Sequence, residues 1–395
     1  MTNRTNEQAM GGDGMTADDV IEAASRQTGL TDIGDPAIRE GLELLCRAYG
    51  EEAHFTARGL EMANADLVTQ MANRMKVEDW LSRHPELLER PVEKPLFVFG
   101  LPRTGTTLLI NLLHADPARR SFLRWEAYDP VPPPRPGELH AGPRYQAMQD
   151  KTQMALKFMP QIAAIHYEDA DSPTECQFAM APSFCAQVYE AQADIPSYRD
   201  WFLHRADYRP AFRYHKRLLQ LLQAEAPGRW TLKNPWHPLF LDALTEIYPD
   251  AQLVMTHRDP AEVLGSIGSL IKHVRQVYSD KVDLHRIGET FVETFRLMID
   301  RQQAFRDKHG QDAILDVQYA DVMRDPITEV RRIYQRFDEP LTPRALAAMD
   351  AYLAANPKGK HGKHDYSLEE YGLTRQGVHA AFADYIERHA IPVRS

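Results

Sequence analysis

Cysteine is scarce in this chain of 395 residues, which contains three: Cys46, Cys176 and Cys185. An odd number without the close spacing of paired metal ligands argues against a disulfide framework and a metal site, and favours a reducing compartment. No apolar run approaches the ~18 residues that a membrane-spanning helix requires. The first residues also lack the apolar segment of a signal peptide. We therefore expect a cytoplasmic protein with no membrane span and no bound metal.

Positive charge is also in short supply, because the formal net charge is -10. A general nucleic-acid-binding surface needs an excess of Lys and Arg, so this class of partner is disfavoured. The hydrophobic content of 43% is ordinary for a globular protein, and the length is sufficient for one large core. We expect a small-molecule partner, and a homodimer is one of the states that the sequence allows.

A third absence lies within the most informative segment, residues 96–107 (LFVFGLPRTGTT). A buried strand is predicted to lead into a loop with the G-x-x-x-x-G frame of a P-loop, and then into a helix. The loop N–H groups, the helix dipole and Arg103 would hold an anion. However, a nucleotide triphosphatase needs Lys directly after the second glycine, and this position is Thr106. The cation has moved to Arg103, which suggests a nucleotide with a different terminal group.

The rest of the chain predicts an α/β fold, in which a P-loop-like parallel β-sheet is flanked by helices. A flexible N-terminus over residues 1–15 and a helical N-terminal extension over 16–92 precede the main domain, 93–395. Alternation of strand-like and helical segments favours a parallel sheet. Within this domain we expect a mostly helical insertion at about 125–225 and a basic segment at 355–395. The predicted strands are 96–100, 229–233, 251–256 and 313–317, and predicted helices include 238–247, 260–272 and 326–337.

A second candidate phosphate site follows the predicted strand 251–256. Arg258 lies at the end of this strand, and Ser266 lies about two turns into the next helix. The two side chains could bind one phosphate from two directions, with Arg able to bind it in a bidentate manner. Taken alone, the pair is better explained as a surface arginine and an exposed serine of the helix.

The combination of the two segments is more specific. The P-R-T-G-T-T loop together with H-R-D-P-x-x-x-x-x-S over 257–266 resembles the nucleotide signatures of sulfotransferases that use 3′-phosphoadenosine 5′-phosphosulfate (PAPS). The resemblance covers about residues 94–340 and is greatest to a bacterial branch of that family. It implies that the first loop binds the 5′-phosphosulfate through Arg103, Thr104, Gly105, Thr106 and Thr107. It also implies that Arg258 and Ser266 bind the 3′-phosphate.

Further matches extend this resemblance. Lys233 lies in a segment similar to the K-x-P-x-H motif of the branch, and Tyr319 resembles the family tyrosine that contacts the adenine. In the basic tail, Lys360 and His364 would supply a closing contact to the 3′-phosphate, unless this tail is simply a solvated segment. Leu108 is a departure, because the cytosolic branch has a Trp there that stacks on the adenine.

The reaction implied by the resemblance is in-line transfer of a sulfonate from PAPS to a hydroxyl, with no metal required. Arg103 and Lys233 would stabilise charge on the bridging and sulfonate oxygens, and a general base would activate the acceptor hydroxyl. Glu126 and His237 are the leading candidates for this base, and His166 and Glu175 are further candidates. Glu126 and His237 could instead have structural roles, Glu126 in a salt bridge and His237 at a helix start.

The acceptor is less well defined. Met and aromatic residues between 154 and 202 could line a pocket for a hydrophobic alcohol or phenol, or could simply belong to the core. A P-loop nucleotide kinase or triphosphatase is a rival hypothesis, disfavoured by the absent lysine. A homologue that binds PAPS or its product 3′-phosphoadenosine 5′-phosphate (PAP) without catalysis is another.

Overall fold

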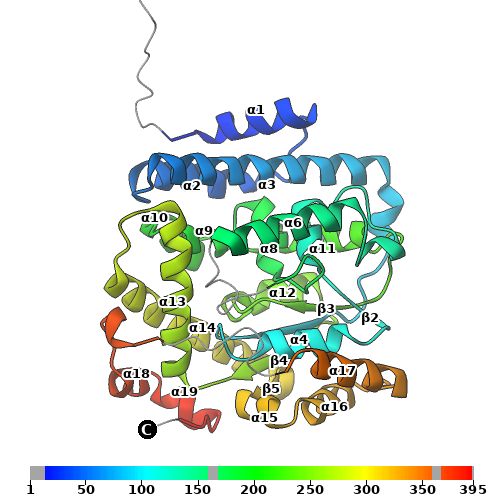
Figure 1. Ribbon diagram of the computed structural model, residues 1–395, viewed down its shortest axis with the longest axis vertical. Coiled ribbons are helices and arrows are strands. Elements are labelled where there is room, and N and C mark those ends of the chain that lie inside the picture. The colour runs from blue at the N-terminus through cyan, green and yellow to red at the C-terminus, as the bar shows by residue number, and fades with distance from the viewer. Residues whose placement is uncertain (1–13, 159–167, 358–365, 394–395) are drawn as a thin grey trace, which may run out of the picture.

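A computed structural model describes residues 14–158, 168–357 and 366–393. Its centre is one parallel sheet of five strands in the order β2-β3-β1-β4-β5. The expected α/β fold, with a parallel sheet flanked by helices, is therefore confirmed (Figure 1). The strands are β1 (Leu96–Gly100), β2 (Arg119–Ser121), β3 (Arg229–Lys233), β4 (Gln252–His257) and β5 (Leu315–Gln318).

The four predicted strands are present, each within two residues of its predicted start. The short strand β2 was not predicted, because Arg-Arg-Ser has neither apolar alternation nor β-branched residues. It exists through pairing with β3, from Arg119↔Arg229 to Ser121↔Thr231. The helix predicted over 238–247 is divided into a 3-10 turn η4 (His237–Leu239) and helix α12 (Leu241–Ile247).

Strand β1 lies in the middle of the sheet and is buried along its whole length. Because successive side chains of a strand point to opposite faces, Phe97 and Phe99 enter the larger core, whereas Leu96 and Val98 enter a smaller one. The register aligns Gly100 with Thr256 of β4. A Cβ at Gly100 would lie 2.4 Å from the Thr256 carbonyl oxygen, so only glycine permits this close approach.

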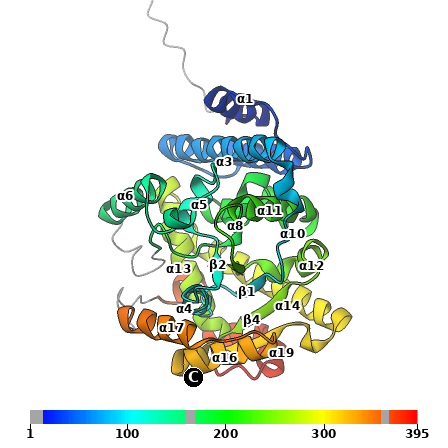
Figure 2. The ribbon, with the colours of Figure 1, turned by 90° about the vertical axis from the view of Figure 1, so that its right-hand side faces the viewer.

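The N-terminal extension forms a helical layer above the sheet (Figures 1 and 2). It consists of α1 (Ala17–Thr28), α2 (Ile38–Glu51), α3 (Ala57–Arg83) and η1 (Pro85–Glu89). The start of α1 is fixed by a reciprocal capping box between Thr16 and Asp19. Leu67, Met71 and Met75 of α3 belong to the same core cluster as Phe97 and Phe99. The extension therefore shares a core with the sheet.

The segment between β1 and β3 is mostly helical. Helix α4 (Thr106–His114) follows β1 directly and packs its apolar face on the smaller core. The remaining elements of this segment are α5 (Arg124–Tyr128), η2 (Pro136–Glu138), α6 (Pro143–Phe158), α8 (Cys176–Met180), η3 (Ala181–Ser183), α9 (Val188–Gln192), α10 (Pro196–His204) and α11 (Arg209–Leu222).

The C-terminal helices complete both faces of the sheet. Two of them begin at Asp-Pro caps: Asp259 accepts from the Ala261 N–H at 2.9 Å, and Asp325 accepts from the Thr328 N–H at 3.1 Å. The helices are α13 (Pro260–Tyr278), α14 (Leu284–His309), η5 (Gln311–Ala313), α15 (Tyr319–Arg324), α16 (Pro326–Arg336), α17 (Pro343–Ala355), η6 (Glu369–Tyr371), α18 (Arg375–Ala381) and α19 (Ala383–Arg388).

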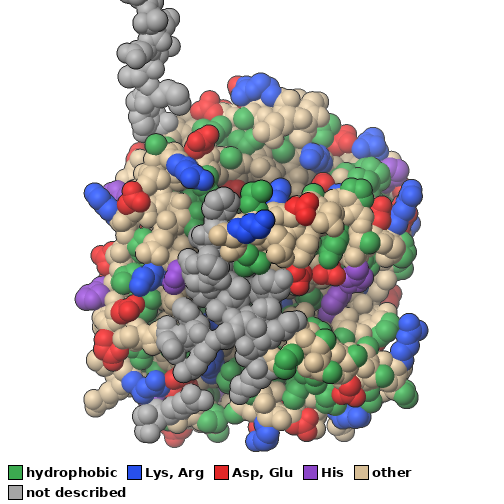
Figure 3. Space-filling view, in the orientation of Figure 1, with side chains coloured by type: hydrophobic (Ala, Val, Ile, Leu, Met, Phe, Trp, Pro, Cys, Tyr) green, Lys and Arg blue, Asp and Glu red, His purple; other side chains and the backbone are tan. Residues whose placement is uncertain are grey.

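The surface agrees with the charge balance of the sequence. On the face shown in Figure 3, the acidic and basic side chains of the described residues are interspersed. Within the described ranges, no helix combines the length and the apolar character needed to cross a bilayer.

Candidate active site

The loop between β1 and α4 is a strained turn held against the neighbouring strand. Arg103 and Gly105 both adopt left-handed backbone conformations, with φ of 67° and 89°. Such a conformation is uncommon for a residue other than glycine, and it persists where surrounding contacts enforce it. Thr104 supplies one such contact, because its hydroxyl donates to the Leu101 carbonyl at 2.7 Å and lies 2.6 Å from the Thr256 hydroxyl. Thr104 thus fixes the shape of the loop.

Helix α4 begins at the end of this loop, with Gly105 at its N-cap and no side chain capping it. The first N–H groups of a helix lack partners within the helix and attract anions. Thr106 and Thr107, on the first turn, line the adjacent cavity together with Arg103 and Gly105. The loop therefore presents hydrogen-bond donors and a cation to the cavity.

The two predicted phosphate sites lie side by side. The Arg103 Nε donates to the Ser266 hydroxyl at 3.1 Å, and an Arg258 terminal nitrogen donates to the Arg103 carbonyl at 2.9 Å. The Arg258 guanidinium lies over the Tyr319 ring, 4.3 Å from its centroid. Burial and the neighbouring Arg258 lower the pKa of Arg103. Two adjacent guanidinium groups favour an anionic ligand.

Lys233 and Glu175 form an ion pair beside the loop. Lys233 ends β3 with only 1% of its side chain exposed, and its Nζ lies 3.2 Å from Glu175 Oε1. An isolated β-bridge joins the two backbones, and the Gln177 amide donates to the other Glu175 oxygen. Because Glu175 lines the cavity, this network holds a carboxylate close to the cationic loop.

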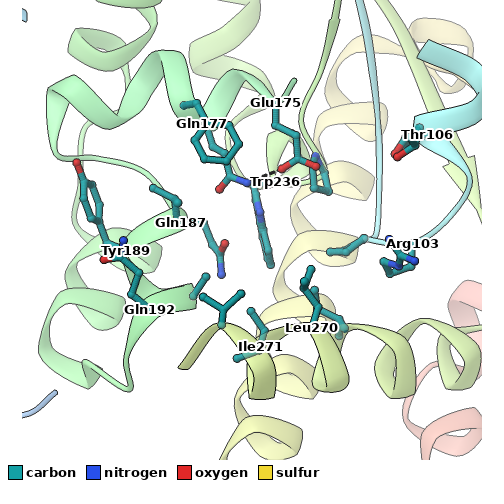
Figure 4. A pocket seen from close by; sticks show the side chains of 18 of the residues that line it. Arg103, Thr106, Glu175, Gln177, Gln187, Tyr189, Gln192, Trp236, Leu270 and Ile271 are labelled. Atoms are coloured by element: carbon teal, nitrogen blue, oxygen red, sulfur yellow. Dashed lines mark hydrogen bonds between the residues drawn. The ribbon is translucent and has the colours of Figure 1, made fainter. Parts of the chain in front are cut away.

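One cavity of about 530 Å³ joins the loop to an apolar chamber. In Figure 4, Arg103 and Thr106 lie on one side, Gln187, Tyr189 and Gln192 lie on the other, and Glu175 and Trp236 lie between them. The apolar walls come from α13, from the segment around α8 and α9, and from Trp236, which follows β3. Their apolar lining residues include Phe178, Val188, Trp236, Ile267, Leu270, Ile271 and Val274.

The two leading candidates for the base are outside the cavity lining. The Glu126 side chain has 0% exposure and lies 2.5 Å from Arg120, and it also accepts from the Leu123 N–H at 3.0 Å. His237 is also fully buried and contacts the Phe97 ring edge-on, with centroids 5.2 Å apart. Burial lowers the pKa of His237 well below its usual value. Their positions thus correspond to the structural alternatives stated above.

Three further candidates, His166, Lys360 and His364, lie outside the described residues. Tyr366, the first described residue after position 365, packs against Gly265 beside Ser266 and donates to Glu262 at 3.0 Å. Glu262 lies 3.5 Å from Arg258. Tyr366 of the C-terminal segment is therefore in contact with the Arg258 region.

Some lining residues were not recognised in the sequence. Ile267, Leu270, Ile271 and Val274 follow Ser266 at helical spacing, and this apolar stripe is a signal that could have been used. Asp66 and Gln70 come from α3, far away in the sequence, and no local pattern marks them. Among the Met and aromatic residues of 154–202, Phe178 and Tyr189 line the cavity, and Tyr189 also belongs to the core. Met180, Phe184 and Phe202 belong to the core and are not part of this lining.

A cluster of potential metal ligands, His257, Asp316 and His389, also lies outside the cavity lining. Asp316 Oδ1 lies 2.7 Å from His257 Nε2 and also accepts from Arg306. The His257 Nδ1 lies 2.9 Å from the Tyr385 hydroxyl. The Arg306 guanidinium beside Asp316 already supplies the positive charge that a metal ion would bring. We interpret the cluster as a hydrogen-bond network that connects α19 to β4.

A parallel sheet whose central strand leads through a glycine-containing loop into a helix defines a P-loop-like α/β protein. Residues 95–343 match the model of the sulfotransferase family, and the chain belongs to this family. It is 34% identical to the sulfotransferase STF9 of Mycobacterium avium, with a TM-score of 0.90 and 99% of both chains covered. The sulfotransferase STF1 of Mycobacterium tuberculosis is also 34% identical, with a TM-score of 0.85 over 95% of this chain and all of that one.

A curated relative provides a third comparison. The omega-hydroxy-beta-dihydromenaquinone-9 sulfotransferase Stf3 of Mycobacterium bovis is 23% identical over 321 residues, which cover 75% of each chain. The family model, the named relatives and the solved structures together identify the protein as a sulfotransferase, a transferase enzyme.

Proposed function

We propose that this sulfotransferase transfers a sulfonate group from PAPS to the hydroxyl of a small, largely hydrophobic alcohol or phenol. The observation that carries the proposal is the continuous cavity of about 530 Å³, which has cationic donors at one side and apolar walls at the other. The relative from Mycobacterium bovis is named for an omega-hydroxylated dihydromenaquinone. An acceptor that joins a hydroxyl to a hydrophobic body is consistent with this cavity.

The nucleotide would bind along the side of the cavity that holds the loop. Loop N–H groups over 103–107, the Thr106 and Thr107 hydroxyls and Arg103 would bind the 5′-phosphosulfate. Arg258 and Ser266 would bind the 3′-phosphate, and Tyr319 would contact the adenine. Lys360 and His364 are proposed to close over the 3′-phosphate. With these cations, the charge of the donor is neutralised without a metal.

The transfer would be direct. The acceptor oxygen forms a bond to sulfur while the bond between sulfur and the bridging phosphate oxygen breaks, and PAP leaves. Glu175 would take the proton of the acceptor hydroxyl, because it is a carboxylate that both lines the cavity and lies beside the loop cations. Lys233 and Arg103 would stabilise the negative charge that develops on the bridging oxygen.

Thermal stabilisation by ligands tests the donor. We expect PAP and PAPS to raise the melting temperature strongly without added metal. Arg258→Ala removes a charged contact of about 1.5–3 kcal/mol, so the Kd for PAP should rise about ten- to hundredfold. Arg26→Ala is the matched control, because Arg26 is an exposed residue of α1 paired with Glu22.

Each alternative predicts a different result. Stronger stabilisation by Mg·ATP than by PAP would contradict the proposal and favour a nucleotide kinase or triphosphatase. Binding of PAPS without sulfonation of any alcohol or phenol in a broad panel would favour a non-catalytic homologue. A normal response to PAP in Arg258→Ala would exclude the proposed 3′-phosphate site.

A further inference from the structure

The end of the cavity remote from the phosphate-binding loop is polar. We call this region the remote end, and it comprises Asp66 and Gln70 of α3 together with Gln187 and Gln192. Figure 4 places Gln187 and Gln192 across the cavity from Arg103 and Thr106. An apolar chamber that ends in four polar side chains is built to recognise more than a hydrocarbon.

A fixed hydrogen-bond network orients the Asp66 carboxylate. Its Oδ2 accepts from the Gln192 amide at 3.3 Å and from the Tyr278 hydroxyl at 3.2 Å. Tyr49 in turn donates to the Gln192 carbonyl oxygen at 2.7 Å. Among the described residues, none donates to Asp66 Oδ1. Burial raises the pKa of Asp66, so a further donor at Oδ1 would stabilise the carboxylate.

Two amide side chains of the remote end have buried atoms without partners. Within the described parts of the chain, Gln187 Nε2 and Gln70 Oε1 are shielded from solvent and make no hydrogen bond. Gln187 is only 4% exposed. Leaving a buried amide group unpaired costs about 1–3 kcal/mol, and such groups are normally satisfied by water or ligand. The remote end therefore offers one donor and two acceptors to a ligand.

The walls between Glu175 and the remote end are apolar. Ile267, Leu270, Ile271 and Val274 form one face of α13, and Trp236 lies between the loop side and the remote end. Gln177, which also lines the cavity and donates to Glu175, is the polar exception beside Glu175. Against the α13 face, a polar group in the middle of a ligand would lose its hydration without gaining a partner. The lining thus fits a molecule with an apolar body and a polar group at each end.

We propose that the acceptor is an apolar diol, with one hydroxyl sulfonated beside Glu175 and the other bound at the remote end. The second hydroxyl would donate to Asp66 Oδ1 and accept from Gln187 Nε2. This proposal rests on the proposed sulfotransferase reaction. A hydroxyl can both donate a hydrogen bond to Asp66 and accept one from Gln187. A carboxylate would be repelled by Asp66, and a carbonyl group cannot donate to Asp66. An ammonium group cannot accept from Gln187.

Matched pairs of ligands test the proposal. A graded series of α,ω-alkanediols is compared with 1-alkanols of equal chain length, first by calorimetric binding to the PAP-saturated protein and then by sulfonation with PAPS. We expect the best diol to bind at least about tenfold more tightly than its mono-alcohol, since one hydrogen bond to a buried charged group is worth that much or more. The ratio of kcat/KM values should show the same preference.

Variants then assign the preference to the remote end. In Asp66→Ala and in Gln187→Leu, the ratio of diol to mono-alcohol affinities should fall towards one. Asp66→Asn keeps the side-chain volume and an acceptor, and it serves if Asp66→Ala does not fold. The ratio of diol to mono-alcohol affinities in Asp66→Asn should lie between the ratios of the wild type and Gln187→Leu. Glu61→Ala, at an exposed position of the same helix, should retain the full preference.

The two proposals fail in different ways. Equal affinities for diols and mono-alcohols at every chain length, or an unchanged preference in both Asp66→Ala and Gln187→Leu, would overturn the diol proposal while leaving sulfonation intact. Failure of PAP to bind would instead contradict the proposed function. In that case, calorimetry on the protein without nucleotide still reports the diol preference of the remote end.

Discussion

At the scale of single residues, Glu175 carries the proposed proton transfer. Replacement by Gln keeps the shape and removes the basic oxygen, so we expect kcat to fall by about 10²–10⁴. The affinity for PAP should stay within about twofold, because the carboxylate does not bind the nucleotide. Single-turnover sulfonation and calorimetry measure the two effects.

Glu126→Gln is the informative comparison. It breaks the buried pair with Arg120, which should cost about 3–5 kcal/mol of the free energy of unfolding, but the rate per folded molecule should be retained. If Glu126→Gln abolished turnover with an unchanged melting temperature, Glu126 would be the base, and the assignment to Glu175 would be wrong.

Buried histidines predict a dependence of stability on pH. Burial lowers the pKa of His114 to about 4, that of His215 to about 3 and that of His237 well below its usual value. Unfolded histidines have a pKa of about 6.5, so the unfolded chain binds more protons below that pH. The free energy of unfolding should therefore fall as the pH drops from about 7 to 5, by up to about 1.4 kcal/mol per histidine and pH unit.

Urea denaturation at a series of pH values measures this slope. His237→Phe fits the surrounding aromatic cluster and removes one titrating group, so it should flatten the slope and keep the turnover per folded molecule. A loss of activity in His237→Phe without a loss of stability would support a catalytic imidazole instead.

Residues of the loop could be predicted from the sequence because their chemistry is local. Gly100, Arg103, Gly105 and Thr106 lie within a few positions of one another, and a strand that leads into a helix fixes their arrangement. Glu175 could be named only as one of several candidates. Its place beside Lys233 depends on a single β-bridge between segments far apart in the chain, and no periodic pattern reports such a contact.

At the scale of elements, the junction between β1 and α4 depends on glycine. A Cβ at Gly105 would lie 2.9 Å from the Tyr319 ring, and its φ of 89° is unfavourable for other residues. Gly105→Ala should therefore displace Tyr319 and add backbone strain of about 1–3 kcal/mol. We expect the Kd for PAP to rise about tenfold, which corresponds to about 1.4 kcal/mol.

The matched control for this substitution is Gly137→Ala, since nothing lies within 4 Å of a Cβ built at Gly137. Its PAP affinity, measured by calorimetry, should equal that of the wild type. If the PAP affinity of Gly105→Ala equals that of the wild type, Tyr319 does not contact the nucleotide.

Strands and helices differ in how well the sequence predicts them. Strands β1 and β4 are buried on both faces, so they are apolar runs that stand out. Strand β2 has no such run and forms only because β3 offers a partner edge. In α13, the Asp-Pro cap marks the start, whereas the end at Tyr278 lies beyond the predicted residue 272 because the helix continues along α3 and α14.

At the scale of the whole molecule, the N-terminal extension and the sheet should unfold together. Helix α3 contributes apolar side chains to the common core, and its buried Arg74 donates to Ser183 at 3.1 Å. We expect the full chain to show one cooperative calorimetric transition. A chain that begins at residue 93 should lack this transition, because it exposes the core surface that α3 covers.

A separate low-temperature transition for α1–α3, or a cooperatively folded truncated chain, would contradict this expectation.

The cavity likewise depends on contacts between distant parts of the chain. It is assembled from α3, the segment around residues 175–192 and α13. Its polar remote end results from tertiary packing, which explains why the residues of the loop side could be named from the sequence and those of the remote end could not.

The continuity of the cavity also has a kinetic meaning. If donor and acceptor occupy two parts of one chamber, both must be present before the sulfonate moves, so double-reciprocal rate plots should intersect rather than run parallel. The acceptor can then also enter while spent PAP still occupies the loop. Such a dead-end complex would make a high acceptor concentration inhibitory, and the release of PAP would become the step that limits steady-state turnover.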